Sequence, residues 1–154
     1  LVREDMLHGL AGLPLTVVGD WGGLGTGAPD TIRFTGPLDS KTVQHMAEHA
    51  QCVVDTTPGY YSSHERLFEG LAGGSLVAMI GQTDFDDLNS SGALVQANRP
   101  EHLADRIAQL LDDGRDLGQR ANAGRAVVLN DHTWTSRARC IKDTLCGDTV
   151  PPHS

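Results

Sequence analysis

Short apolar runs alternate with amphipathic stretches along the chain, which predicts strands alternating with helices. The predicted strands are runs of apolar and β-branched residues bounded by glycine or polar residues, at 15–18, 31–35, 51–55, 76–80 and 93–95. Elsewhere apolar residues recur at helical spacing, as Val43, Met46, Ala47 and Ala50 do. The predicted helices cover about 1–11, 39–50, 62–73, 100–113, 115–130 and 131–145, and a polar loop or one helical turn covers 82–92.

This alternation predicts an α/β fold, in which a Rossmann-like parallel sheet carries helices on both faces. Ligands of such folds bind at the carboxyl ends of the strands. Gly19, Gly36, Gly81 and the segment 55–61 fall at such ends. The length suits one domain, which we expect over residues 1–146, followed by a disordered tail over 147–154.

Composition narrows the class of protein. The formal net charge of −8 argues against nucleic-acid or anionic-membrane partners, because these require basic patches. No apolar run approaches the length of a membrane span, so we expect no transmembrane segment. The three cysteines are odd in number and lack C-x-x-C spacing, which favours free thiols in the cytoplasm, with Cys52 as a small core residue.

A glycine-rich loop follows the first predicted strand, from Gly19 to Gly27. Gly23, Gly25 and Ala28 satisfy the G-x-G-x-x-A spacing of dinucleotide-binding folds. That fingerprint must open a helix, whereas here a strand is predicted only a few residues after Ala28, so NAD is not the expected ligand. Two readings stay open: a loop without a ligand role, and a loop that closes over a ligand.

The segment 60–78 carries the most informative chemistry. It predicts a loop, a helix beginning near Ser62 or Ser63, a Gly-Gly stop and a buried strand. Free N–H groups and the positive end of the dipole at the start of this helix can hold a phosphate. Within the helix, the Glu69 carboxylate can accept hydrogen bonds from sugar hydroxyls. Together they indicate a nucleotide-sugar site; the alternative is a solvated helix face on which Arg66 pairs with a neighbour.

Other candidate sites are weaker. There is no H-E-x-x-H motif, and we find no carboxylate–histidine cluster at ligand spacing, so no metal site is predicted. His45, His49 and His102 are expected on helix surfaces. The segment 131–137 predicts a helix start that Asp131 or Thr133 caps, with Trp134 packed.

Several segments in combination are similar to a known family. They are 32–38 (Ile-Arg-Phe-Thr-Gly-Pro-Leu), 53–55, 66–74 (Arg-Leu-Phe-Glu-Gly-Leu-Ala-Gly-Gly), the predicted helix 100–111, Gly124-Arg125, and His132-Thr133-Trp134 with Arg137. Over about residues 1–146 the chain resembles the carboxyl-terminal, donor-binding half of GT-B glycosyltransferases, in the family 4-like and CgeB-like group.

The resemblance implies an enzyme that moves a sugar from a nucleoside-diphosphate sugar, such as a UDP-sugar, to an unknown acceptor, without a metal or further cofactor. The roles that it implies fall on these residues: Glu69 for the ribose, Ser62, Ser63 and His64 for the diphosphate, Arg66 for the phosphate or sugar, Phe34 and Thr35 for the base through their backbone, and Gly19 with Asp20 at the cleft floor. An amino-terminal GT-B domain would bind the acceptor, and the isolated donor half would turn over little. No catalytic residue is identified.

The chain also departs from the family pattern. Many relatives carry a second glutamate eight positions before the one that matches Glu69, and Tyr61 stands there. The usual Arg and Lys pair that neutralises the leaving diphosphate is not matched, and Arg33 and Lys41 are candidates only by proximity in sequence. A non-catalytic nucleotide- or sugar-binding module, a degenerate GT-B half, therefore stays open as an alternative.

Overall fold

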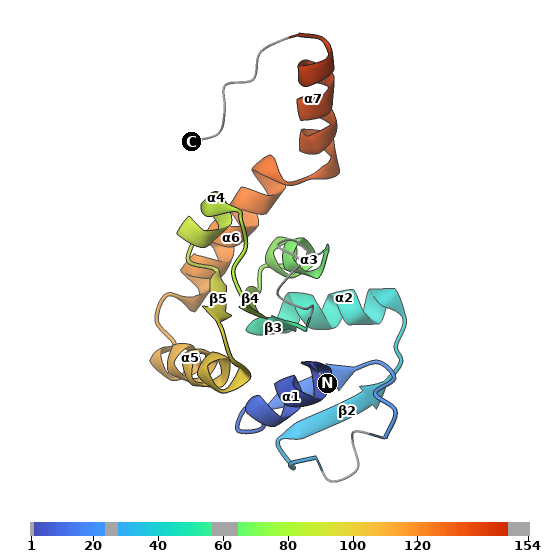
Figure 1. The fold of residues 1–154 in the computed structure, drawn as a ribbon, viewed down its shortest axis with the longest axis vertical. Coiled ribbons are helices and arrows are strands. Elements are labelled where there is room, and N and C mark those ends of the chain that lie inside the picture. The colour runs from blue at the N-terminus through green and yellow to red at the C-terminus, as the bar shows by residue number, and fades with distance from the viewer. Residues whose placement is uncertain (1, 24–27, 57–64, 148–154) are drawn as a thin grey trace.

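The computed structural model describes residues 2–23, 28–56 and 65–147 and contains seven helices and five strands within those ranges (Figure 1). In chain order these are α1 (Val2–Gly9), β1 (Leu15–Val18), β2 (Ile32–Gly36), α2 (Ser40–His49), β3 (Cys52–Asp55), α3 (Glu65–Gly73), β4 (Leu76–Ile80), α4 (Asp86–Ser90), β5 (Leu94–Ala97), α5 (Pro100–Asp113), α6 (Leu117–Asp131) and α7 (Trp134–Leu145). Each predicted strand and helix is present, and the helical turn allowed for in 82–92 is α4.

The strands are parallel, as predicted, but they form two sheets rather than one. β1 pairs with β2, and β4 lies between β3 and β5 in the second sheet. Residues 76–79 of β4 are all buried, which explains their uninterrupted apolar run. The alternation of elements predicted parallel pairing, but the break between β1 and β3 is a property of the tertiary structure.

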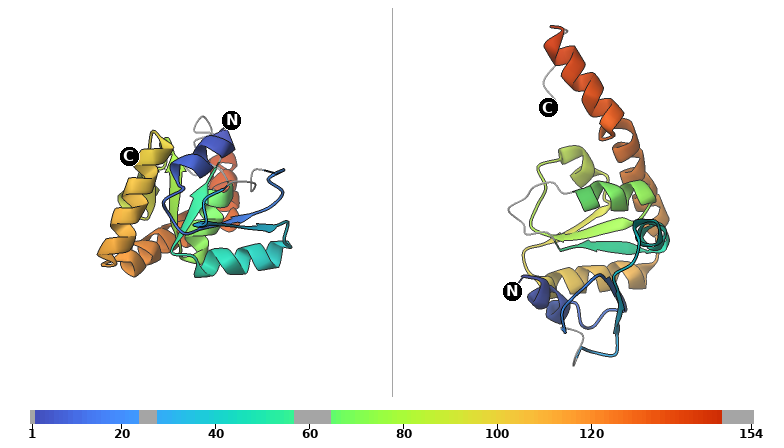
Figure 2. Two further views of the ribbon diagram at one scale, coloured as in Figure 1. Left: turned by 90° about the horizontal axis from the view of Figure 1, so that it is seen from below. Right: turned by 90° about the vertical axis from the view of Figure 1, so that its right-hand side faces the viewer.

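Helices cover both faces of the three-stranded sheet (Figure 2). On one face, Leu67 and Leu71 of α3 pack with Val77 and Met79 of β4 and with Val128 of α6. On the other face, a second apolar cluster joins α1, α5, β4 and β5 through Met6, Leu10, Ala78, Val95, Leu103 and Ile107. From Val77 to Ile80, successive residues of β4 thus contact opposite clusters, as the period of a strand requires. The predicted α/β architecture with helices on both faces is confirmed.

The helix ends follow local chemistry. The Asp39 side chain accepts hydrogen bonds from the backbone N–H groups of Lys41 and Thr42 and caps α2. Thr133, rather than Asp131, caps α7 by accepting from the N–H of Ser136. Gly114 ends α5 in the left-handed region, with φ of 56°. Of the two cap candidates that the sequence left open for α7, the structure therefore selects Thr133 over Asp131.

The cysteines differ in environment. Cys52 is half-buried and packs against both apolar clusters, and this burial raises the pKa of its thiol to about 12. Cys140 and Cys146 are exposed. The prediction of a core role for Cys52 is confirmed, and its thiol stays protonated at neutral pH.

Of the remaining sequence predictions, one is wrong and others concern residues that the structure does not describe. Trp134 was predicted to pack, but 80% of it is exposed, so that prediction is wrong. Three parts lie outside the described residues: the predicted start of the helix at Ser62 or Ser63, residues 24–27 of the glycine-rich loop, and the tail beyond Gly147. Among the helices that the structure describes, none has the length and apolar character needed to cross a membrane.

Candidate functional site

The carboxyl ends of β1 and β2 meet at two glycines. Gly19 follows β1 and Gly36 ends β2, with φ of 114° and 72°, a region that favours glycine. The Gly19 N–H donates to the Gly36 carbonyl over 2.9 Å. The Trp21 indole N–H donates to the Val18 carbonyl over 3.1 Å, so this side chain folds back over the strand end. A side chain at Gly19 would strain this edge, where the sequence predicted a ligand.

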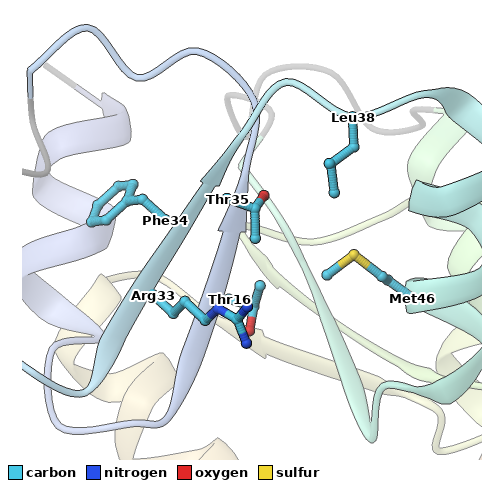
Figure 3. A pocket seen from close by; sticks show the side chains of 6 residues that line it. All are labelled: Thr16, Arg33, Phe34, Thr35, Leu38 and Met46. Carbon is cyan, nitrogen blue, oxygen red and sulfur yellow. The ribbon is translucent and has the colours of Figure 1, made fainter.

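A groove lies between the β1–β2 sheet and α2. It has a volume of about 510 Å³, within the usual range for small-molecule sites, and is lined by Thr16, Arg33, Phe34, Thr35, Leu38 and Met46. Figure 3 shows the side chains of Thr35, Leu38 and Met46 turned toward one another, whereas Phe34 projects from the opposite side of β2. Thr16 lies opposite Arg33 in the strand register, so β1 and β2 both contribute.

The groove contains two of the predicted base-binding residues, Phe34 and Thr35. The Thr35 hydroxyl donates to the carbonyls of Val17, over 3.4 Å, and Gly36, over 3.1 Å. The donor hydrogen of this hydroxyl is therefore used by the backbone of β1 and β2. The groove also contains Arg33, which is exposed and supplies a positive charge. Sequence reasoning did not single out Thr16 or Met46, because nothing local to either indicates that β1 and α2 face one another.

The α3 helix presents the predicted polar residues on its outer side. Leu67, Gly70 and Leu71 are buried, whereas Arg66 and Glu69 are exposed. Residues three apart share a helix face, so the guanidinium and the carboxylate project on the same side of α3. Neither residue lines the groove between β2 and α2. Ser62, Ser63 and His64 precede the described part of α3, so their predicted role stays a prediction.

A polar and aromatic cluster holds α3 against the later helices. His132 Nε2 lies 2.6 Å from Asp87 Oδ2, and 12% of the His132 side chain is exposed. The imidazole lies tilted to the Phe68 ring at 5.3 Å and edge-on to the Phe85 ring at 5.0 Å, centroid to centroid. The Arg137 guanidinium carbon lies 4.9 Å from the Phe68 centroid. Because Phe68 is adjacent to Glu69, this cluster fixes the helix that carries the predicted ribose ligand.

Comparison with known proteins identifies the family. Residues 3–143 match the sequence model of the family described as glycosyl transferase-like. The chain belongs to the glycosyl transferase-like family. A search of curated proteins gives no match.

Solved structures are similar to this glycosyl transferase-like chain in fold. One of them is HepE from Anabaena, solved in complex with UDP-glucose, with 17% sequence identity and a TM-score of 0.70. The similarity covers 94% of this chain and 45% of HepE, so this chain spans less than half the length of that protein. The Rossmann-like fold expected from the resemblance is therefore confirmed.

The segment His132-Thr133-Trp134 of this glycosyl transferase-like chain packs differently from the prediction. It was predicted to cap a helix and pack Trp134, and Thr133 does provide the cap. The residues that pack are instead His132, against two phenylalanine rings, and Arg137, which also lies over the exposed Trp134 ring at 5.4 Å. The partner of His132 is 45 positions away, so no local pattern reveals it.

Proposed function

We propose that this chain is the donor-binding half of a GT-B glycosyltransferase, which transfers a sugar from a nucleoside-diphosphate sugar to an acceptor. The observation that carries the proposal is the family match over residues 3–143, joined to a fold similar to part of a protein solved with UDP-glucose. Uridine diphosphate is accordingly the first nucleotide to test.

In the proposed complex, the donor lies across the carboxyl ends of the strands. The ribose hydroxyls donate to the exposed Glu69 carboxylate, and the diphosphate accepts hydrogen bonds from the N–H groups at the start of the α3 segment, where Ser62, Ser63 and His64 stand. Arg66, on the same side of α3 as Glu69, adds a positive charge. The backbone groups of Phe34 and Thr35 bind the base near Gly19.

Such a site promotes transfer by stabilising the diphosphate as it leaves. N–H groups and cations that are already positioned lower the free energy of the developing negative charge. The proposal requires no metal and no cofactor beyond the donor itself. Arg33 in the groove is exposed and is the candidate for a second cation.

The proposed enzyme needs a second, amino-terminal GT-B domain to bind the acceptor. This chain corresponds to 45% of HepE, which leaves room in that protein for another domain. The α7 helix extends beyond the body of the molecule and exposes 61% of Ile141 and 81% of Leu145, apolar surface that a second domain would cover (Figure 2). We place the enzyme in the cytoplasm, in keeping with three free cysteines.

Titration with UDP and GDP, by calorimetry, tests the donor site. Glu69→Gln should weaken UDP binding by about tenfold or more, because a hydrogen bond to a charged group contributes about 1.5–3 kcal/mol. Glu65→Gln, a change of the same kind on the exposed side of the same helix, serves as the control and should retain binding within about threefold, since a rim charge contributes little. Equal UDP affinity in Glu69→Gln and the parent chain would remove Glu69 from the ribose role.

The presence of Tyr61 where relatives carry glutamate favours a second candidate, a non-catalytic nucleotide- or sugar-binding module. The two functions differ in the fate of the donor. The protein with both halves should release UDP from a UDP-sugar in the presence of acceptor if it is a transferase. Saturable UDP binding without any such release would favour the binding module.

A further inference from the structure

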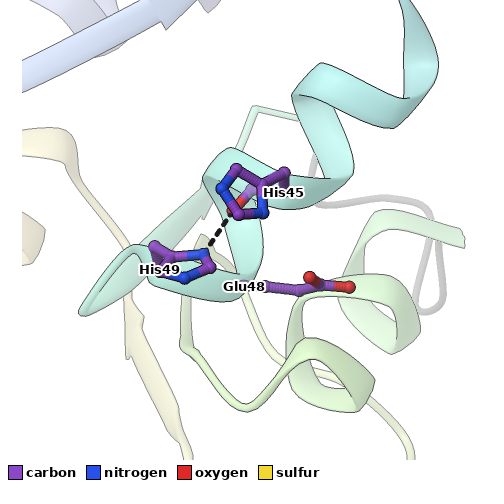
Figure 4. A group of neighbouring side chains, drawn as sticks. All are labelled: His45, Glu48 and His49. Carbon is purple, nitrogen blue, oxygen red and sulfur yellow. Dashed lines mark hydrogen bonds between the residues drawn. The ribbon is translucent and has the colours of Figure 1, made fainter.

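A cluster of metal-ligating side chains lies on the last turns of α2, away from the proposed donor site. His45, Glu48 and His49 are exposed, and one ligand atom from each lies within 4.8 Å of the others (Figure 4). Their spacing of i, i+3 and i+4 places them on one face of the helix. The sequence here is H-x-x-E-H, the reverse of H-E-x-x-H, and the expectation that no carboxylate–histidine cluster stands at ligand spacing is therefore wrong.

The His49 ring is oriented for ligation. Its Nδ1 lies 2.8 Å from the His45 carbonyl oxygen, which can only accept, so Nδ1 carries the hydrogen. In the neutral ring, Nε2 then keeps its lone pair and is available to a metal. A hydrogen bond from the second ring nitrogen to a backbone carbonyl is the usual support of a metal-binding histidine.

Glu48 is oriented in a similar way. Gln44 Nε2 donates to Glu48 Oε1 over 3.0 Å, which leaves Oε2 for a ligand. The stem of Glu48 lies against α3, since a Cβ on Gly73 would stand 3.5 Å from Glu48 Cγ. The contact between α2 and α3 therefore holds the backbone of the site, while the ligand groups stay exposed.

The donor set selects the kind of metal. Two imidazoles and one carboxylate suit Zn²⁺ and its neighbours Co²⁺, Ni²⁺ and Cu²⁺, whereas Mg²⁺ and Ca²⁺ prefer oxygen alone. Ligand atoms of a tetrahedral Zn²⁺ site with bonds of about 2.0–2.2 Å stand about 3.4 Å apart. The ligand atoms lie within 4.8 Å of one another, so binding requires small side-chain rotations that draw them together, and a fourth position stays open to water.

We propose that His45, Glu48 and His49 bind one divalent transition-metal ion of the Zn²⁺ class. The site is separate from donor binding: α2 ends at His49, near the amino end of β3, whereas the proposed nucleotide site lies at the carboxyl ends of the strands. The ion joins three ligands across the last turn of α2 and stabilises that turn where it packs on α3.

Calorimetric titration of the tag-free, chelator-treated chain with ZnCl₂ tests the site. We expect saturable binding of one ion, no binding of Mg²⁺, and a higher melting temperature with Zn²⁺. His45→Ala and His49→Ala should each lower Zn²⁺ affinity by at least about tenfold, the loss that even outer partners of metal ligands cause. All three ligands are exposed, so these variants should fold.

Two controls isolate the cluster. His102→Ala, an exposed histidine on α5, should bind Zn²⁺ as the parent chain does. Because exposed Cys140 and Cys146 are also potential Zn²⁺ ligands, the titration is repeated with both changed to serine, and binding should persist. The proposal is overturned by any of three results: loss of binding in the serine variant, unchanged affinity in His45→Ala and His49→Ala, or no saturation up to about 1 mM metal, the weak end of measurable affinities. Whether UDP binds does not affect this outcome.

Discussion

Gly124 lies in the middle of α6, where that helix crosses α3 and the start of β5. A Cβ at this position would stand 2.4 Å from the Cβ of Ala93 and 3.0 Å from Leu71 Cδ2. Glycine normally weakens a helix interior, so its presence here reflects the close approach of neighbouring elements. The Gly124-Arg125 pair belongs to the family resemblance, and the packing gives the physical reason for its first residue.

At position 124 alanine should be less favourable than glycine, which is the reverse of their usual helix propensities. Gly124→Ala should lower the free energy of unfolding by about 1–3 kcal/mol, because the added methyl overpacks a buried contact. Gly118→Ala, in the same helix with nothing within 4 Å of the added Cβ, should raise it by up to about 1 kcal/mol. Urea denaturation of both variants measures the difference. A Gly124→Ala variant as stable as the parent would show that α3 and α6 are not so closely packed.

At the scale of the element, the start of α2 depends on one carboxylate. Hydrogen bonds from the Thr42 hydroxyl, over 2.6 Å, and from the backbone N–H groups of Thr42 and Lys41, over 3.1 Å each, hold the pKa of Asp39 below its ordinary value of 3.8. A lowered folded-state pKa means that the ionised cap stabilises the fold above the unfolded value, and that this contribution is lost as pH falls through the folded one.

Asp39→Ala should therefore lower the melting temperature at pH 7, and the difference from the parent should shrink as pH falls below about 4. Asparagine caps helices nearly as well without a charge. Asp39→Asn should thus retain most of the stability at pH 7 while losing this acid dependence. Thermal unfolding between pH 3 and 7 measures both effects. A gap between Asp39→Ala and the parent that does not change over this range would contradict the role of the ionised cap.

The junction of α3, α4 and α6 depends on the His132 ring. Its position beside Phe68 and Phe85 and its contact with Asp87 combine packing with a polar partner. His132→Ala should lower the free energy of unfolding by about 1–3 kcal/mol, because it leaves a gap between two rings. Asp87→Asn removes the charge and keeps the packing, so it should cost less. If the two variants lose equal stability in urea denaturation, the polar contact rather than ring packing dominates.

At the scale of the whole molecule, α7 is the least covered of the long helices. Its residues include no buried side chain, and Trp134, Ile141 and Leu145 are mostly exposed. The contact of Arg137 with Phe68 lies near the first turn, so the rest of the helix has little to hold it in this chain. Apolar surface of this extent in a glycosyl transferase-like chain supports the proposed second domain.

Amide hydrogen exchange tests this difference. In the chain alone, amides in the second half of α7 should exchange faster than those at the centre of α6, because few contacts oppose local opening. In a protein that contains both proposed halves, the same α7 amides should become protected. Protection of α7 equal to that of α6 in the chain alone would mean that α7 does not need a second domain.

The candidate site could be predicted in part. The exposed face of α3 with Arg66 and Glu69 follows from helical periodicity, because the apolar Leu67 and Leu71 must face the core. The groove between β2 and α2, the His132–Asp87 contact and the exposure of Trp134 could not be predicted, because each depends on residues far apart in the sequence. The H-x-x-E-H cluster was readable from its spacing but was overlooked.

By itself, the sequence determined the order of strands and helices and limited their caps to a few nearby residues. These features depend on neighbours within a few residues: the period of apolar side chains, the short polar side chain before a helix, and glycine after one. The tertiary structure alone decided that β1 and β2 form a sheet of their own, that β4 is the central strand of the other, and that His132 packs where Trp134 was expected. Those outcomes depend on how whole elements share buried surface, a quantity that no local window of the sequence contains.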